Sequence, residues 1–111
     1  MAVSDEFLEY VMDQLFSLED VTLRKMFGGA GVFSRGKVFG IVAGDSLFFK
    51  VDDSNRDRYI KAGSEQFMPF PDKEIYMPYY RVPDGVLDDP EALCNWALKS
   101  IEIPSSRKSK N

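Results

Sequence analysis

Residues 24–52, "RKMFGGAGVFSRGKVFGIVAGDSLFFKVD", decide the fold class, because short β-type runs alternate there with glycine-containing turns. The runs are rich in β-branched and aromatic residues, which favour strands. Arg35-Gly36 and Gly44-Asp45 lie between runs at hairpin spacing, and glycine supplies the positive φ that tight turns require. The stretch predicts an antiparallel meander from Val21 to Asp52.

Three glycines at the start of this stretch, Gly28, Gly29 and Gly31, raise the question of a phosphate-binding loop. A P-loop requires Lys and then Ser or Thr after its last glycine, whereas this sequence continues with two apolar residues. A dinucleotide fingerprint requires a helix after its glycines, but the next segment is β-like. We therefore predict that the glycines allow a bulge or kink, through which the strand from Leu23 continues into Val32-Phe33.

Helix signals occur on both sides of the meander, in residues 4–20, 54–63 and 88–102. Apolar residues in the first segment recur at spacings of three and four, which is typical of an amphipathic helix. Ser4, Ser54 and either Asp88 or Asp89 stand at the expected N-caps. Gly63 is expected to stop the second helix.

Residues 66–83 are expected to form two more strands around a turn at Pro71-Asp72. Pro69 and Pro78 cannot donate a ladder hydrogen bond, so these strands should be irregular or lie at an edge. The predicted fold class is α+β: a two-layer arrangement with an antiparallel sheet of about five strands and helices packed on it. The predicted order of elements is α-β-β-β-α-β-β-α.

Length and charge limit what the chain can do. Its 111 residues predict a single domain over residues 1–103, followed by a disordered basic tail over residues 104–111. The net charge is −4, and the tail holds Arg107, Lys108 and Lys110, so the remainder is more acidic still. We therefore do not expect direct, tight nucleic-acid binding.

The sequence offers no set of residues for catalysis, a cofactor or a metal. It contains no histidine and a single cysteine, Cys94, which excludes His-dependent catalysis, an ordinary zinc site and an internal disulfide. Cys94 is expected to be a small buried side chain, and Asp52-Asp53 and Asp88-Asp89 to cap helices. With no apolar run long enough to span a bilayer, we expect a cytoplasmic protein. Because the sequence offers no set of residues for catalysis, we expect that the protein is not an enzyme.

The stretch IYMPYYRVP (75–83) gives the candidate partner surface, which comprises Tyr76, Tyr79, Tyr80 and Arg81. Strand alternation places Tyr79 and Arg81 on one side and Tyr76 and Tyr80 on the other, and only one side can enter the core. Tyr, Met and Arg are enriched where proteins meet other proteins. The alternative that the tyrosines merely cover the sheet remains open.

Two blocks of the sequence resemble the TfoX N-terminal domain family. In the first block, RKMFGGAGVFSRGKVFGIVAGDSLFFKVD, the family's motif residues, which we expect to be mainly structural, are Met26, Phe27, Gly28, Gly29 and Gly31. The second block is MPYYRVPDGVLDDPEALCNWA (77–97), and the match runs in order from about Leu23 to Leu98. The resemblance implies an α+β fold with helices on an antiparallel sheet, in agreement with the local patterns.

The resemblance also implies a function. Full-length members of this bacterial family are competence regulators that act with a transcription factor and carry a second, helical domain, whereas this chain ends at Asn111. We therefore expect a stand-alone, non-enzymatic module for protein interaction and transcriptional regulation, with a protein partner such as a transcription factor. Two alternatives stay open: a weak nucleic-acid-binding domain of the double-wing type, and a homodimer formed through an exposed edge strand.

Overall fold

The computed structural model describes residues 4–26, 28–69 and 76–104. The elements follow one another as α1 (Asp5–Gln14), β1 (Val21–Met26), β2 (Gly29–Ser34), β3 (Lys37–Ala43), β4 (Ser46–Lys50), α2 (Arg56–Lys61), β5 (Tyr79–Arg81), α3 (Asp84–Leu87) and α4 (Pro90–Ile101). The strands form one antiparallel sheet in the order β1-β2-β3-β4-β5. The predicted α+β class and the five-stranded antiparallel sheet are confirmed.

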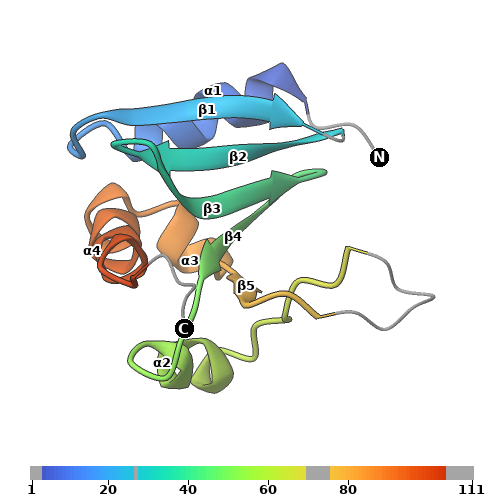
Figure 1. Ribbon diagram of the computed structural model, residues 1–111, viewed down its shortest axis with the longest axis vertical. Helices are drawn as coiled ribbons and strands as arrows, with labels where there is room; N and C mark the ends of the chain where they lie inside the picture. The colour runs from blue at the N-terminus through green and yellow to red at the C-terminus, as the bar shows by residue number, and fades with distance from the viewer. Residues whose placement is uncertain (1–3, 27, 70–75, 105–111) are drawn as a thin grey trace.

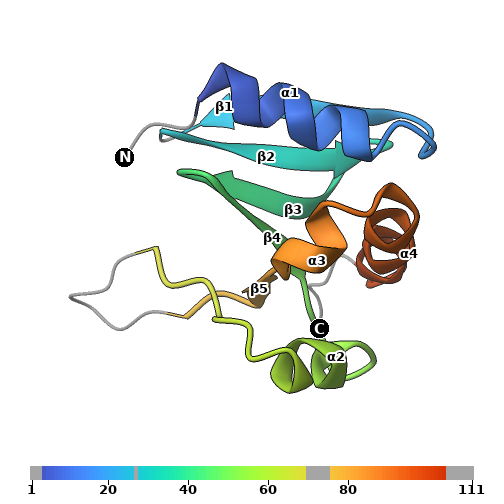
Figure 2. The same ribbon diagram turned by 180° about the vertical axis from the view of Figure 1, so that it is seen from behind.

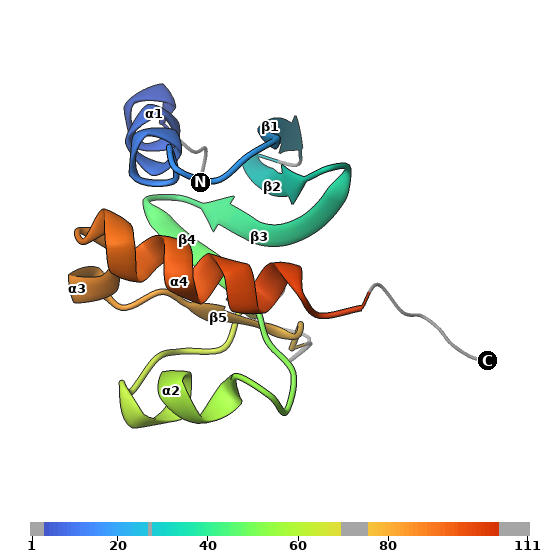
Figure 3. The same ribbon diagram turned by 90° about the vertical axis from the view of Figure 1, so that its left-hand side faces the viewer.

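The helices α1, α3 and α4 lie on one side of the sheet. Figure 1 views the strands with α1 behind them, and Figure 2, from the opposite side, shows α1, α3 and α4 in front of the strands. In Figure 3, α1 and α3 lie to one side of β1 and β2, and α4 runs below β3. The helix α2 lies at the end of the molecule away from α1 (Figure 1). The arrangement has the two layers that the sequence predicts.

The distribution of strands differs from the predicted order. Four strands precede α2 and one follows it, whereas the expectation was three and two. Within residues 66–83 only β5 is a strand of the described chain, and Gln66 makes an isolated bridge to Tyr80. The expected turn at Pro71-Asp72 lies outside the described residues. The short helix α3 was not predicted, because four residues are too few to show an apolar period.

The glycines of the first block form a turn, so the predicted bulge was wrong. β1 and β2 pair with Met26 opposite Gly29, which means that the chain reverses between these two residues. Gly28 has a φ of 80°, a conformation that glycine adopts without a Cβ clash. The register instead shifts between Val32 and Phe33 in the pairing of β2 with β3. Glycine-rich segments permit a bulge and a turn equally, and only strand pairing distinguishes them.

The two other hairpins follow the prediction. Arg35 and Gly36 both have positive φ, 52° and 83°, as a two-residue type I′ turn requires. Gly44 has a φ of 62° in the next turn, where Ala43 pairs with Ser46. Both loops are two residues long, so they fix the register of the strands that they join.

Side-chain caps begin the long helices. Ser4 Oγ accepts a hydrogen bond from the Phe7 N–H at 3.1 Å, as predicted, although α1 ends at Gln14 rather than at residue 20. At α4 the predicted cap is Asp89, which accepts from two backbone N–H groups. Ser54 is not the N-cap of α2; that position is held by Asn55.

The core joins α1 and α4 to the inner face of the sheet. Its largest fully buried aromatic side chains are Phe39, Phe49 and Tyr59. The Tyr59 ring meets the Trp96 ring edge-on, with centroids 4.9 Å apart. The Arg58 guanidinium lies over the same Trp96 ring. Trp96 thereby connects α2 with α4.

Replacement of Gly29 by Ala tests the close approach of β2 and β3. A Cβ at this position would lie 2.5 Å from the backbone carbonyl oxygen of Val42, which cannot move without disturbing the sheet. We expect Gly29→Ala to lower the free energy of unfolding by about 1–3 kcal/mol, measured by urea denaturation. The control is Gly85→Ala, whose Cβ meets nothing within 4 Å and whose stability should stay equal or rise. Equal stability of the two variants would contradict this packing.

Replacement of Tyr59 by Phe tests the state of its buried hydroxyl. Among the described residues, the hydroxyl finds no hydrogen-bond partner. The nearby Ser100 hydroxyl donates its hydrogen bond to the Lys50 carbonyl at 2.7 Å. Burial raises the pKa of Tyr59 well above its ordinary value of 10.0. Because the unfolded chain ionises first, wild-type stability should fall as the pH rises above about 10.

Tyr59→Phe should therefore lose less stability than wild type between about pH 9 and 11, measured as the urea midpoint. At neutral pH we expect its free energy of unfolding to change by less than about 1 kcal/mol, because no hydrogen bond is removed. Parallel pH profiles for the two proteins would show that the hydroxyl is not desolvated.

Candidate interaction surface

The face of the sheet opposite α1, α3 and α4 carries no helix of the described chain (Figures 1 and 3). Strand alternation decides which side chains it presents. Val42, Leu47 and Phe49 are buried beneath the helices, so their strand neighbours Ile41 and Phe48 point to the opposite face. Both of these apolar side chains are only partly buried.

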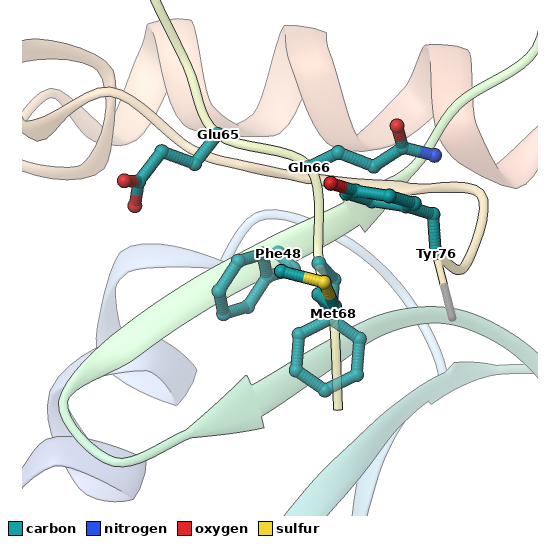
Figure 4. Close-up of a pocket in the computed structure, with 6 residues that line it drawn as sticks. Phe48, Glu65, Gln66, Met68 and Tyr76 are labelled. Carbon is teal, nitrogen blue, oxygen red and sulfur yellow. The ribbon is translucent and has the colours of Figure 1, made fainter. Parts of the chain in front are cut away.

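A groove of about 490 Å³ lies where β4 meets the segment that leads into β5. Its lining residues are Phe48, Glu65, Gln66, Phe67, Met68 and Tyr76. The rings of Phe48 and Phe67 pack with centroids 4.8 Å apart. In Figure 4 the polar ends of Glu65 and Gln66 lie on one side of the groove, and Phe48 and Met68 on the other. The groove can therefore take an apolar side chain beside a polar rim.

Backbone hydrogen bonds hold one wall of the groove against β5. The Arg81 N–H donates to the Glu65 carbonyl at 2.9 Å, and the Phe67 N–H donates to the Tyr79 carbonyl at 2.7 Å. The Gln66 side chain adds a bond from Nε2 to the Met77 carbonyl at 3.0 Å. Residues 65–67 thus cover the outer side of β5, so the exposed edge expected for this strand is already occupied by the chain itself.

The structure separates the four residues of the predicted partner surface. Tyr76 is 57% exposed and lines the groove. Tyr79, by contrast, is only 6% exposed, so its predicted place on the surface was wrong, and desolvation raises its pKa. Tyr80 is half-buried, and its ring packs on the Tyr59 ring towards the core, with centroids 5.8 Å apart. The sequence could not show that Tyr79 is buried, because residues 65–67, which cover β5, lie 12 or more residues before it along the chain.

Arg81, the fourth residue, lies half-buried on the helix-free face. Its Nε donates to Ser46 Oγ at 3.3 Å, and its Nη2 donates to an Asp84 carboxylate oxygen at 3.0 Å. The register places it directly opposite Phe48, which lines the groove. Tyr76 and Arg81 are therefore the two predicted residues that the groove and its border bring together.

The family-motif glycines shape the sheet. Gly28 occupies the turn, Gly29 lies against the Val42 carbonyl, and Gly31 pairs with both Arg24 and Ile41. Met26 is the last residue of β1, and Phe27 lies outside the described residues.

Sequence reasoning missed the apolar part of the groove, formed by Phe48, Phe67 and Met68. A signal existed at Phe48-Phe49, since two adjacent large aromatic residues in a strand must point to opposite faces. One of them therefore had to lie outside the helix-covered core. Phe67 and Met68 carried no comparable signal, because they lie in a segment without period.

The other candidate groups serve the fold. Asp52 accepts hydrogen bonds from the N–H and Oγ of Ser54, which hold its pKa below the ordinary range. Cys94 is buried, as predicted, and accepts from Ser17 Oγ at 3.1 Å. Over residues 4–26, 28–69 and 76–104, no group of three or more His, Cys, Asp or Glu could hold a metal ion. No helix within those ranges has the length and apolar character needed to cross a membrane.

The family model of the TfoX N-terminal domain matches residues 13–103 of the chain. The chain belongs to the TfoX N-terminal domain family. The matched region runs from within α1 to just beyond α4, so it includes the whole sheet and every residue of the groove. No curated protein matches the chain. The groove of this chain thus lies within the matched region.

The two tyrosines of this surface should respond differently to truncation. Tyr79→Ser removes a buried ring and should lower the free energy of unfolding by about 3 kcal/mol or more. Tyr76→Ser removes an exposed ring of the same size and should change it by less than about 0.5 kcal/mol. Urea denaturation of both variants measures the difference. Similar losses would mean that Tyr76 is also part of the core.

Proposed function

We propose that this TfoX N-terminal domain is a non-enzymatic protein-interaction module, and that the groove beside β5 contacts its partner. The groove on the helix-free face is the observation that carries this proposal. Its apolar lining combines half-buried Phe48, Phe67 and Met68 with the exposed ring of Tyr76. A soluble domain gains nothing in its own core from leaving such a surface open, whereas a partner would remove it from water.

The types of residue in the groove suit a protein partner. Aromatic side chains and Met are enriched in protein–protein interfaces, and the unbranched Met side chain adapts to irregular surfaces. Gln66 and Glu65 add polar groups at the border, where an interface usually has a polar rim. The wall that bears them is fixed to β5 by backbone hydrogen bonds, so the groove is formed before binding.

The regulatory part of the proposal rests on the family. We propose that the partner is a transcription factor, that the complex regulates genes for DNA-transformation competence, and that it works in the cytoplasm. The module would act by bringing the groove to its partner rather than by a reaction, since no set of residues in the sequence suggests catalysis.

Affinity capture from the native cell lysate, with nuclease treatment and mass spectrometry, tests the groove. The test variant is Met68→Ser/Tyr76→Ser, which replaces two apolar side chains of the lining. The matched control is Phe16→Ser/Ile60→Ser, which replaces side chains that are 76% and 55% exposed and do not line the groove. We expect a partner to be retained by wild type and the control, and reduced at least tenfold with the groove variant.

Retention of the same proteins by all three forms would overturn the assignment of the groove. Thermal unfolding of each form shows whether a loss of binding reflects a loss of fold. Recovery of a transcription factor or a polymerase subunit would support the regulatory role.

A further inference from the structure

Charge is segregated between the layers of this acidic chain. The five strands contain five Lys or Arg residues and no Asp or Glu; the cations are Arg24, Lys25, Lys37, Lys50 and Arg81. The helix α1, on the other layer, contains four Asp or Glu residues and no Lys or Arg. The net charge of −4 therefore conceals a sheet whose charged side chains are all positive.

A single cross-strand row connects two of these cations. The register pairs Arg24 with Gly31, Gly31 with Ile41, Ile41 with Phe48, and Phe48 with Arg81. Directly paired residues point to the same face, so the row lies on the helix-free face with an arginine at each end. Four strand spacings separate the ends, a span of about 19 Å between backbones.

The two arginines have different neighbours. Arg24 is exposed, and its guanidinium lies 5.7 Å from the centre of the Phe33 ring, on the same face. Arg81 is paired with Asp84, but their side chains are 36% and 77% exposed, and such a pair contributes little. A partner carboxylate can therefore replace Asp84 at the Arg81 guanidinium, or bind the guanidinium together with Asp84, because the guanidinium has five N–H donors.

The middle of the row is apolar and opens into the groove. Ile41 and Phe48 are half-buried, and Gly31 carries no side chain to block passage between Arg24 and Ile41. Phe48 belongs both to the row and to the groove lining. The row and the groove therefore form one continuous surface, with positive charge at the two ends of the row.

We propose that this row binds an extended, acidic segment of a partner protein, with carboxylates at the two arginines and apolar side chains between them. This inference rests on the proposed function and specifies the chemistry of the partner. An extended chain rises about 3.3 Å per residue, so the two carboxylates should be five to seven residues apart. Arginine suits this role because its planar guanidinium binds a carboxylate with two parallel hydrogen bonds.

Other occupants fit the surface less well. A nucleic-acid strand would bring phosphates towards the carboxylate of Glu65, which is exposed on the rim of the groove. Of the three residues between the arginines, Gly31 and Ile41 cannot stack on a base, and only half-buried Phe48 could. A second copy laid face to face would bring arginines together, which is unfavourable.

A display library of random twelve-residue peptides, selected on the immobilised full chain, tests the proposal. Counter-selection uses the Arg24→Gln/Arg81→Gln variant, and Lys37→Gln/Arg56→Gln is the matched control with two cations outside the row. We expect enrichment of peptides with two Asp or Glu five to seven residues apart around apolar residues. Their affinity, measured by fluorescence anisotropy, should fall at least fivefold in the row variant and less than twofold in the control.

The inference would be overturned by enrichment of peptides without acidic pairs, by no enrichment, or by tighter binding of a ten-nucleotide oligothymidylate than of any selected peptide. Self-association that the row variant abolishes, seen by sedimentation, would assign the row to a second copy and overturn it too. Lysate capture that is lost with Met68→Ser/Tyr76→Ser but kept with Arg24→Gln/Arg81→Gln would refute the row while leaving the proposed function intact.

Discussion

The register of the four-stranded meander is the constraint on which the rest of the structure depends. Side chains in a strand alternate between faces, so a slip of one residue would exchange the core face for the open face. Arg35, Gly36 and Gly44 adopt positive φ in two-residue loops, and such loops leave no length to spare for a slip. The choice of Phe49 for the core and Phe48 for the open face follows from these turns.

The interaction surface depends on the register in two ways. It places Arg24, Ile41, Phe48 and Arg81 in one row across the sheet, although they are far apart in sequence. It also leaves Phe48 available to pack on Phe67, which forms the apolar wall of the groove. The strand pairing that builds the core therefore also forms this surface.

How far the sequence could predict this protein depended on the range of the interactions concerned. Helix starts at Ser4 and Asp89 were predictable, because a cap bonds to backbone groups two or three residues away. The hairpin turns were predictable for the same reason. The turn at Gly28 was mistaken for a bulge, since the two alternatives use the same residue types and differ only in which strand lies alongside. Tyr79 was misplaced because residues 65–67, which pair with β5, are not its neighbours in sequence.

The sequence by itself determined the family, the α+β class, the hairpins and the absence of histidine chemistry, because each is written in residue identity or in short-range spacing. The tertiary structure alone decided which aromatic side chains remain exposed and which cations share a face. The exposure of a side chain and its neighbours on a face depend on segments that meet only after the chain has folded. Glu65 meets Arg81 in this way, and Phe48 meets Phe67. No local pattern encodes those meetings, so the groove and the arginine row emerge only from the folded chain.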